Sequence, residues 1–107
     1  MAEPAFAFDA LGDPNRRAIL ELLSAGPASV QSLADRLPIS RPAVSRHLRL
    51  LKTAQLVQDE AVGSRRLYRL CPDGVEAARR YFEQLWGEAA QRFRLVADNT
   101  EGTPDGE

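Results

Sequence analysis

The stretch SRPAVSRHLRLL, from Ser40 to Leu51, combines residue types and spacings that suit contact with DNA. Wound as a helix at about 100° per residue, it gathers Val44, Leu48 and Leu51 into one narrow apolar sector that favours burial. The opposite arc is small or cationic, holds no acid, and consists of Arg41, Pro42, Ser45, Arg46 and Arg49. In a DNA major groove, Arg binds guanine edges and Ser bonds phosphate or base. The pattern predicts a helix that is anchored on one side and reads DNA with the other; an ordinary solvated helix face is the alternative.

Capping residues place this helix in a helix-turn-helix arrangement. The Ser40 hydroxyl is suited to cap the amino end, and a proline in the first turn costs the helix no hydrogen bond. A shorter helix is expected before it over residues 30–37, capped by Ser29 and followed by the connection Pro38-Ile39. Two short helices joined by a turn of about three or four residues, the second carrying exposed cations, make a helix-turn-helix.

The rest of the chain predicts further helices and one β-hairpin. A short helix is expected over residues 4–11, and the pair Asp13-Pro14 starts a second one that ends before Gly26-Pro27. The DNA-reading helix continues to residue 55. Its successors are two strands, 56–61 and 65–70, joined through residues 62–64.

Two strands alone are marginally stable, so this hairpin must lean on the helical core. Leu67 and Tyr68 fall on opposite faces, and one of them is expected to pack on the helices. The predicted fold class is mainly α with a small β-hairpin, a winged helix-turn-helix with four helices, two strands and a fifth helix.

The last helix, opened by residues 72–74 and running through 75–98, carries a long apolar stripe. Its members recur at intervals of three or four residues and are Val75, Ala78, Phe82, Leu85, Ala89, Phe93 and Val96. Tyr81 and Trp86 widen the stripe. Since so small a core cannot cover both sides of this helix, we expect part of the stripe to form a subunit interface; a helix packed only on its own domain is the alternative.

Composition sets the frame for these elements. The 107 residues, 44% hydrophobic, suit one domain over 4–97 followed by a disordered acidic tail over 98–107. The net charge of −1 is unevenly distributed, at +6 from Arg36 to Leu70 and −7 elsewhere, so one surface can attract a polyanion. No membrane span or basic secretory start is present, and the single Cys71 excludes an intrachain disulfide. A cytoplasmic location is expected.

These segments together resemble the ArsR/SmtB family of small bacterial winged-helix repressors. The resemblance runs from about Phe8 to Val96 and rests on FDALGDPNRRAILELL, SLADRLPISRPAVSRHLRLLKTAQLV, GSRRLYRL and the closing helix. It implies a homodimer joined by the first and last helices, with interface residues Phe6, Phe8, Phe82, Leu85, Trp86, Ala89, Phe93 and Val96. It also implies groove-facing residues Ser40, Arg41, Pro42, Ser45, Arg46 and Arg49, with Arg65 and Arg66 on a wing (residues 56–70) near the DNA backbone or the minor groove.

The departures from the family pattern concern metals. Metal-sensing members carry a CxC-type pair where this chain has Ser29 and Gln31, or His and acidic ligands on the last helix, which here has no His. A zinc or thiophilic site needs about three or four such ligands, which one Cys and one His cannot supply within a subunit. We therefore expect no metal site and no cofactor, a structural role for His47, and resemblance to the non-metal members, whose effector is often unknown or absent.

The sequence favours a homodimeric autorepressor that binds a palindromic operator through the helix 40–51 and the wing 56–70. Catalysis has no support, because no nucleophile–base pattern, phosphate loop or HExxH occurs and Glu76, Glu83 and Glu88 suit a solvated helix face. A dimeric protein-interaction module is one alternative, distinguished by weak salt dependence of its binding. The other is a redox-responsive repressor that uses Cys71.

Overall fold

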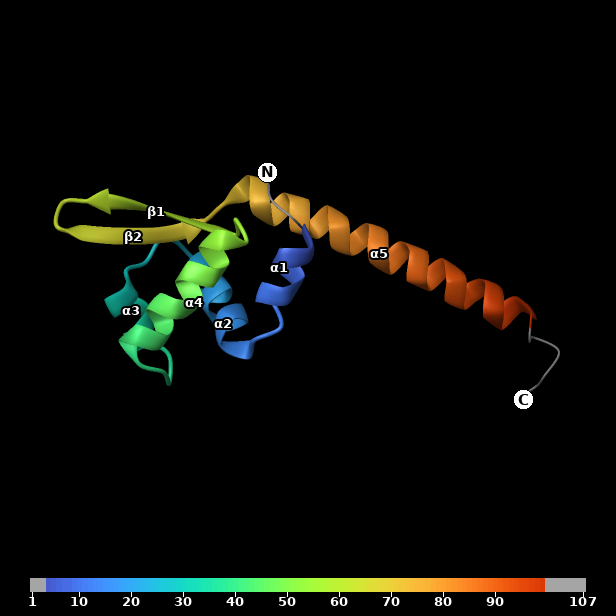
Figure 1. Cartoon of the computed structure of the whole chain (residues 1–107), viewed down its shortest axis with the longest axis horizontal. Helices are drawn as coiled ribbons and strands as arrows, with labels where there is room; N and C mark the ends of the chain where they lie inside the picture. The colour runs from blue at the N-terminus through green and yellow to red at the C-terminus, as the bar shows by residue number, and fades with distance from the viewer. Residues whose placement is uncertain (1–3, 100–107) are drawn as a thin grey trace.

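Seven elements follow one another in the predicted order, and the winged helix-turn-helix is confirmed (Figure 1). The computed structural model describes residues 4–99, with side chains described for 7–97. The elements are α1 (Pro4–Ala10), α2 (Pro14–Ser24), α3 (Val30–Asp35), α4 (Arg41–Thr53), β1 (Val57–Val62), β2 (Arg65–Leu70) and α5 (Pro72–Asn99). No helix within 4–99 is long and apolar enough to cross a bilayer.

The boundaries differ from the sequence-based ones by one or two residues at several ends. The expected third helix, 30–37, stops at Asp35, and the first strand runs over 57–62 instead of 56–61. The strand starts later because Leu56 completes the end of α4: its N–H donates to Leu51 O at 2.9 Å, while Gln55 takes a left-handed φ of 62°. At the other end of the chain, α5 extends to Asn99, beyond the expected start of the tail at 98; residues 100–107 of that tail lie outside the described part.

The core lies between the helices α2, α3 and α4, with the hairpin closing one side. Ile19, Leu33, Val44, Leu48 and Leu51 have fully buried side chains. The predicted burial of one face of α4 is therefore confirmed, because three of these five side chains come from that face. This burial fixes the rotation of α4 and turns its arginines outward.

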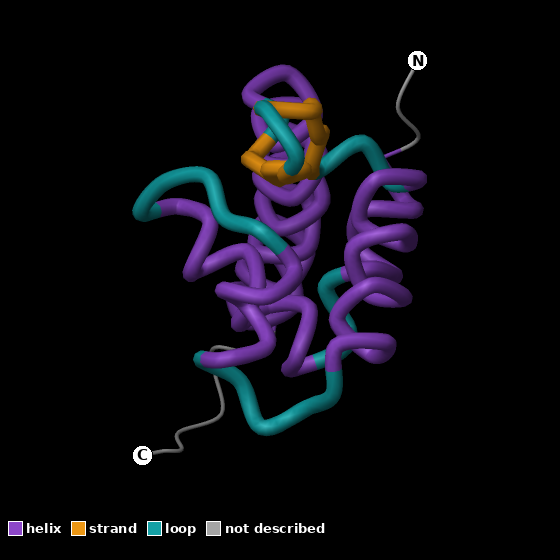
Figure 2. Tube along the Cα trace, turned by 90° about the vertical axis from the view of Figure 1, so that its left-hand side faces the viewer, coloured by secondary structure: helices purple, strands orange, loops and turns teal. Residues whose placement is uncertain are grey.

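The hairpin, called the wing below, leans on the helices as expected. β1 pairs antiparallel with β2, with Val57 opposite Leu70 and Asp59 opposite Tyr68. Tyr68 also exchanges two backbone hydrogen bonds with Ala28, of 2.9 and 2.8 Å, which attach the wing to the segment before α3. Tyr68, not Leu67, packs on the core. Figure 2 views the wing from its tip, beside the helices.

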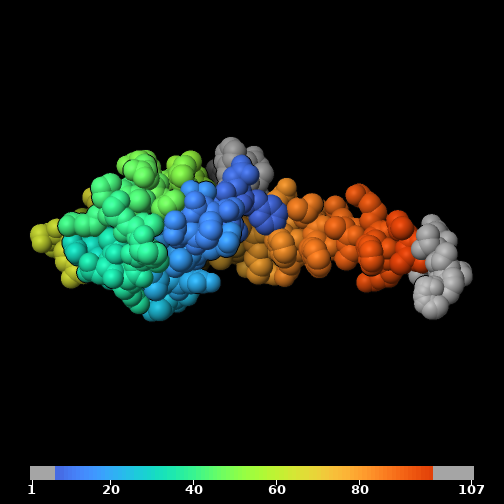
Figure 3. Space-filling view, turned by 90° about the horizontal axis from the view of Figure 1, so that it is seen from below, coloured from blue at the N-terminus to red at the C-terminus, as the bar shows by residue number. Residues whose placement is uncertain are grey.

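Helix α5 leaves the body and gives the molecule an elongated shape of 66 × 31 × 20 Å (Figures 1 and 3). Its first turn lies against the end of α4, where a Cβ on Gly74 would overlap the Gln55 carbonyl oxygen. Only glycine permits this approach. Further along, α5 packs against α1, and its remaining turns extend beyond every other element.

Candidate DNA-binding surface

Helix α4 is built to present its cationic face. Ser40 caps it, accepting a hydrogen bond from Ala43 N at 3.3 Å, and Pro42 occupies the first turn. With Val44, Leu48 and Leu51 buried, the predicted groove-facing residues lie on the outer side. Ser45 is half-buried, and the exposed ones are Ser40, Arg41, Pro42, Arg46 and Arg49.

A hollow of about 720 Å³ separates α3 from the wing. The segment around α3 contributes two hydroxyls, the amide of Gln31, the carboxylate of Asp35 and the guanidinium of Arg36. Arg41 from α4 and the wing residues Arg65 and Arg66 line its other sides. The structure thus brings three predicted DNA-binding arginines together in one concave surface.

Arg36 belongs to the same surface but was not among the predicted site residues. In the sequence it falls in the basic segment, yet it lies outside the cationic arc of α4. Only the packing of α3 against α4 and the wing places it in the hollow. Its neighbour Asp35 accepts a hydrogen bond from Gln31 Nε2 at 3.1 Å, which occupies that carboxylate within α3.

Ion pairs divide the basic residues of this region into two groups. Asp59 holds Lys52 and Arg66, each at 2.7 Å, and Glu60 holds Arg69 at 2.8 Å. Hydrogen bonds from Lys52 and Arg66 lower the pKa of Asp59 below its ordinary value. The other group has no ion-pair partner within residues 7–97 and comprises Arg36, Arg41, Arg46, Arg49 and Arg65. The two wing arginines predicted as equivalent thus differ: Arg65 is unpaired and Arg66 is held.

His47 lies on the side of α4 that faces α2, where it contacts a residue of that helix. Its Nδ1 is 3.3 Å from Arg16 Nη1, and Arg16 Nε donates to Ala10 O at 2.6 Å. This chain of contacts ties α4 to the junction of α1 and α2.

Ser29 and Gln31, the positions compared above with a metal-binding pair, make local hydrogen bonds in this structure. Ser29 Oγ accepts the hydrogen bond from Ser32 N that caps α3, and Gln31 binds Asp35. Cys71 is half-buried and its thiol is free; its backbone N–H donates a hydrogen bond to Leu56 O. Over the described part of the chain, no three His, Cys, Asp or Glu side chains gather as a metal site would require.

The apolar stripe of α5 is largely uncovered. Phe8 of α1 touches its near end, with ring centroids 5.3 Å from Tyr81 and 5.6 Å from Phe82. Beyond that point the predicted interface side chains are open to solvent, with Trp86 64% and Phe93 74% exposed. Leu85, Ala89 and Val96 are exposed as well, as is Leu95, which was not predicted. Phe6 was also predicted here, but its side chain lies outside the described residues.

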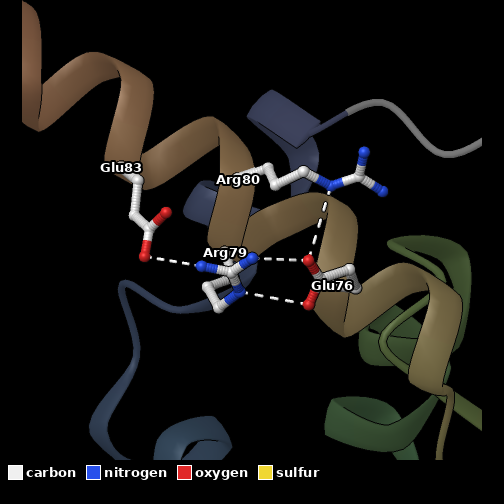
Figure 4. Close-up of polar contacts among 4 residues, drawn as sticks. All are labelled: Glu76, Arg79, Arg80 and Glu83. Atoms are coloured by element: carbon white, nitrogen blue, oxygen red, sulfur yellow. Dashed lines mark hydrogen bonds and ion pairs between the residues drawn. The ribbon is translucent and has the colours of Figure 1, made fainter.

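The charged side chains along one side of α5, by contrast, form ion pairs with one another (Figure 4). Arg79 binds Glu76 and Glu83, one turn to either side, and Arg80 Nε lies 3.5 Å from Glu76. Hydrogen bonds from Arg79 lower the pKa of Glu76. Glu83 is exposed, as predicted, and Glu76 is half-buried; both carboxylates are engaged in ion pairs within their own helix.

Comparison with known proteins agrees with this architecture. A family model described as a helix-turn-helix domain matches residues 11–60. The HTH-type transcriptional regulator Rv2034 of Mycobacterium tuberculosis is 47% identical over 96 residues, covering 90% of each chain. An ArsR-like transcriptional regulator from Rhodococcus sp. RHA1 superposes with a TM-score of 0.74 at 34% identity, covering 89% of this chain and 90% of that one.

A further similar structure is that of a homodimer. The homodimeric winged helix-turn-helix DNA-binding domain Mb0332 from Mycobacterium bovis, a possible ArsR-family regulator, gives a TM-score of 0.62 at 29% identity, with 81% of this chain and 78% of that chain covered. The chain described here belongs to the ArsR/SmtB family of winged helix-turn-helix, DNA-binding transcriptional regulators.

Proposed function

We propose that this chain acts as a homodimeric repressor, also of its own operon, that binds a palindromic operator with α4 in the major groove and the wing along the backbone. One observation carries the proposal: five arginines that have no ion-pair partner within residues 7–97 lie at the end of α3, on α4 and on the wing, whereas the acids Glu60, Glu76 and Glu83 are already paired. Guanidinium groups that no carboxylate neutralises attract phosphates and base edges, which supply anions and hydrogen-bond acceptors.

The arginines divide by position into two roles. Arg46 and Arg49 project from the middle of the exposed face of α4, opposite the buried stripe, and we assign them to guanine edges. Arg36, Arg41 and Arg65 border the hollow beside α3, and we assign them to one DNA strand's phosphates. Ser40, Pro42 and Ser45 complete the groove-facing surface, and Arg66 borders the hollow while bound to Asp59.

A second copy of the chain is the partner we assign to the open stripe of α5. Large apolar side chains exposed along one helix face mark a protein interface. The similar M. bovis domain, which is homodimeric, supports this choice. Two linked copies place two α4 helices on half-sites about one turn of DNA apart, which explains why a palindrome is expected.

We propose no catalytic role and no metal cofactor, and we place the protein in the cytoplasm, where bacterial DNA is accessible. DNA binding accounts for the features of the described surface, and the relatives named above are transcriptional regulators. Any effector is left unassigned.

Alanine variants of the arginines test the DNA-binding assignment. Arg46→Ala and Arg49→Ala should each weaken operator binding by about 1–3 kcal/mol and relax sequence preference. Arg65→Ala should weaken operator and random duplexes alike and make the log–log salt dependence shallower by about one. Gel shifts at several salt concentrations measure both effects.

Arg80→Ala is the matched control, because Arg80 is also an exposed arginine but lies on α5, paired with Glu76. It should bind DNA as the unmodified chain does. Unchanged affinity in all three test variants would contradict the assignment of this surface.

A further inference from the structure

Asp59 is the most enclosed acidic side chain at the DNA-binding surface. It lies in β1, yet its side chain is only 6% exposed. One carboxylate oxygen, Oδ1, is 2.7 Å from Lys52 Nζ in the last turn of α4; the other, Oδ2, is 2.7 Å from Arg66 Nη1 in β2. A single carboxylate therefore connects the DNA-reading helix to both strands of the wing.

The ion pairs of Asp59 lie where the wing joins the body, next to the hollow between α3 and the wing. Asp59 is opposite Tyr68, at the register where the Ala28 bridge attaches the wing to the body. Residues 60–67 project beyond that point. Arg66 also lines the hollow between α3 and the wing, so one of the two cations that Asp59 holds stands beside the proposed path of the phosphates.

The next residue, Glu60, offers a direct comparison. It also binds an arginine of β2, Arg69, but on the opposite face of the hairpin and with a side chain that is 53% exposed. Neither Glu60 nor Arg69 lines the hollow. The two neighbouring acids carry the same charge and each pairs with an arginine, but only the arginine that Asp59 holds, Arg66, lines the hollow.

We propose that Asp59 is a specificity-determining residue: by holding Lys52 and Arg66, it keeps two cations from DNA phosphates and so limits binding to random DNA. The inference rests on the proposed DNA-binding function. Sequence-independent affinity comes from phosphates neutralised by Lys and Arg, and each added contact steepens the log–log salt dependence by about 0.9. Restraining one cation at the end of α4 and one on the wing lowers this contribution and leaves recognition to the arginines of α4.

Asp59→Asn tests the proposal, with Glu60→Gln as the control that changes the net charge equally. Binding to an operator and to a random duplex is measured from 50 to 200 mM salt. For Asp59→Asn we expect random-duplex affinity to rise about threefold to tenfold, a slope steeper by about one to two, and a smaller operator-to-random ratio. Glu60→Gln should give a clearly smaller change, and Asp59→Glu should restore the original slope.

Equal slopes in Asp59→Asn and the unmodified chain would overturn the proposal, and so would equal effects of Asp59→Asn and Glu60→Gln. A purely structural role predicts the reverse sign, because a loosened wing would weaken both duplexes. If neither duplex shows any salt dependence with the unmodified chain, the proposed function itself fails; if the unmodified chain shows it and Asp59→Asn does not steepen it, only the inference about Asp59 fails.

A second pair of variants keeps the test valid if Asp59→Asn does not fold. Lys52→Gln removes a held cation and should leave the random-duplex slope nearly unchanged. Arg65→Gln removes an unpaired cation from the same surface and should make the slope shallower by about one. If Lys52→Gln and Arg65→Gln reduce the slope of the random-duplex salt dependence equally, the proposal is overturned. Circular dichroism and a thermal melt of each variant establish that the fold is intact.

Discussion

Helices α4 and α5 are both amphipathic, but the fold treats their two faces in opposite ways. In α4 the apolar side chains of Val44, Leu48 and Leu51 are at most 1% exposed, while its arginines have no ion-pair partner within the described residues. In α5 the charged flank is paired internally through Arg79, while Phe82, Trp86 and Phe93 are 49–74% exposed. Each helix leaves open the face that a different partner has to meet: an anion for α4 and an apolar surface for α5.

The largest expected effect comes from placing a charge on the open face of α5. Leu85→Asp or Phe93→Asp should give monomers, because an unpaired charge buried in an apolar seam costs several kcal/mol. Operator binding should then collapse, since two half-sites need two linked α4 helices. Sedimentation velocity and gel shifts measure the two outcomes.

Gln91→Asp is the control for that experiment. It adds the same charge to an exposed position on the side of α5 opposite the stripe, and it should leave the dimer intact. Dimers in both stripe variants would show that the subunit interface lies elsewhere.

The next effect contrasts the two apolar faces by truncation. Leu48→Ala removes a side chain that is 1% exposed and should lower the free energy of unfolding by about 2–5 kcal/mol. Leu85→Ala removes one that is 47% exposed, and in dilute protein, where dimers dissociate, it should cost less than about 1 kcal/mol. Urea unfolding at a series of protein concentrations separates the two; a similar cost for both in the dilute limit would mean that α5 packs on its own domain.

The smallest expected effect is the pH dependence of stability that the ion pairs of Asp59 cause. The pKa of Asp59 is lowered in the folded protein from the ordinary 3.8 by hydrogen bonds from Lys52 and Arg66. The ionised carboxylate therefore stabilises the fold above about pH 4, and this contribution is lost as the pH falls through the folded-state pKa. Thermal melts should show that the free energy of unfolding of the unmodified chain exceeds that of Asp59→Asn by about 1 kcal/mol at pH 7. This difference should shrink below about pH 4. A gap independent of pH would contradict the role of the charge.

Local features made much of this fold predictable. The caps Asp13, Ser29 and Ser40 each bond backbone N–H groups two or three residues ahead, so the amino ends of three helices are encoded in adjacent residues. The burial of one face of α4 followed from its period alone. The start of β1 did not, because Leu56 is drawn into the end of α4 by a bond to Leu51 that only the folded chain forms.

The candidate site was predictable in its location and only partly in its membership. The cationic arc of α4 is a property of one helix, and the structure exposes it. Arg36 joins the surface through packing of α3 beside the wing, and no spacing in the sequence relates it to Arg65. Gly74 likewise looks like a helix-opening glycine in the sequence, while its close approach to Gln55 depends on how α5 docks.

The sequence by itself determined the elements, the apolar and cationic faces of α4 and the apolar stripe of α5, because each depends on residues within a few positions of one another. Tertiary structure decided which charges are available and which apolar face is covered. Lys52, Asp59 and Arg66 belong to three different elements. Only the hairpin register and its attachment to the helices bring the Lys52 and Arg66 nitrogens each to 2.7 Å from an Asp59 carboxylate oxygen. The stripe of α5 is open because the body ends where the helix continues, and the extent of that body is a property of the whole packed chain.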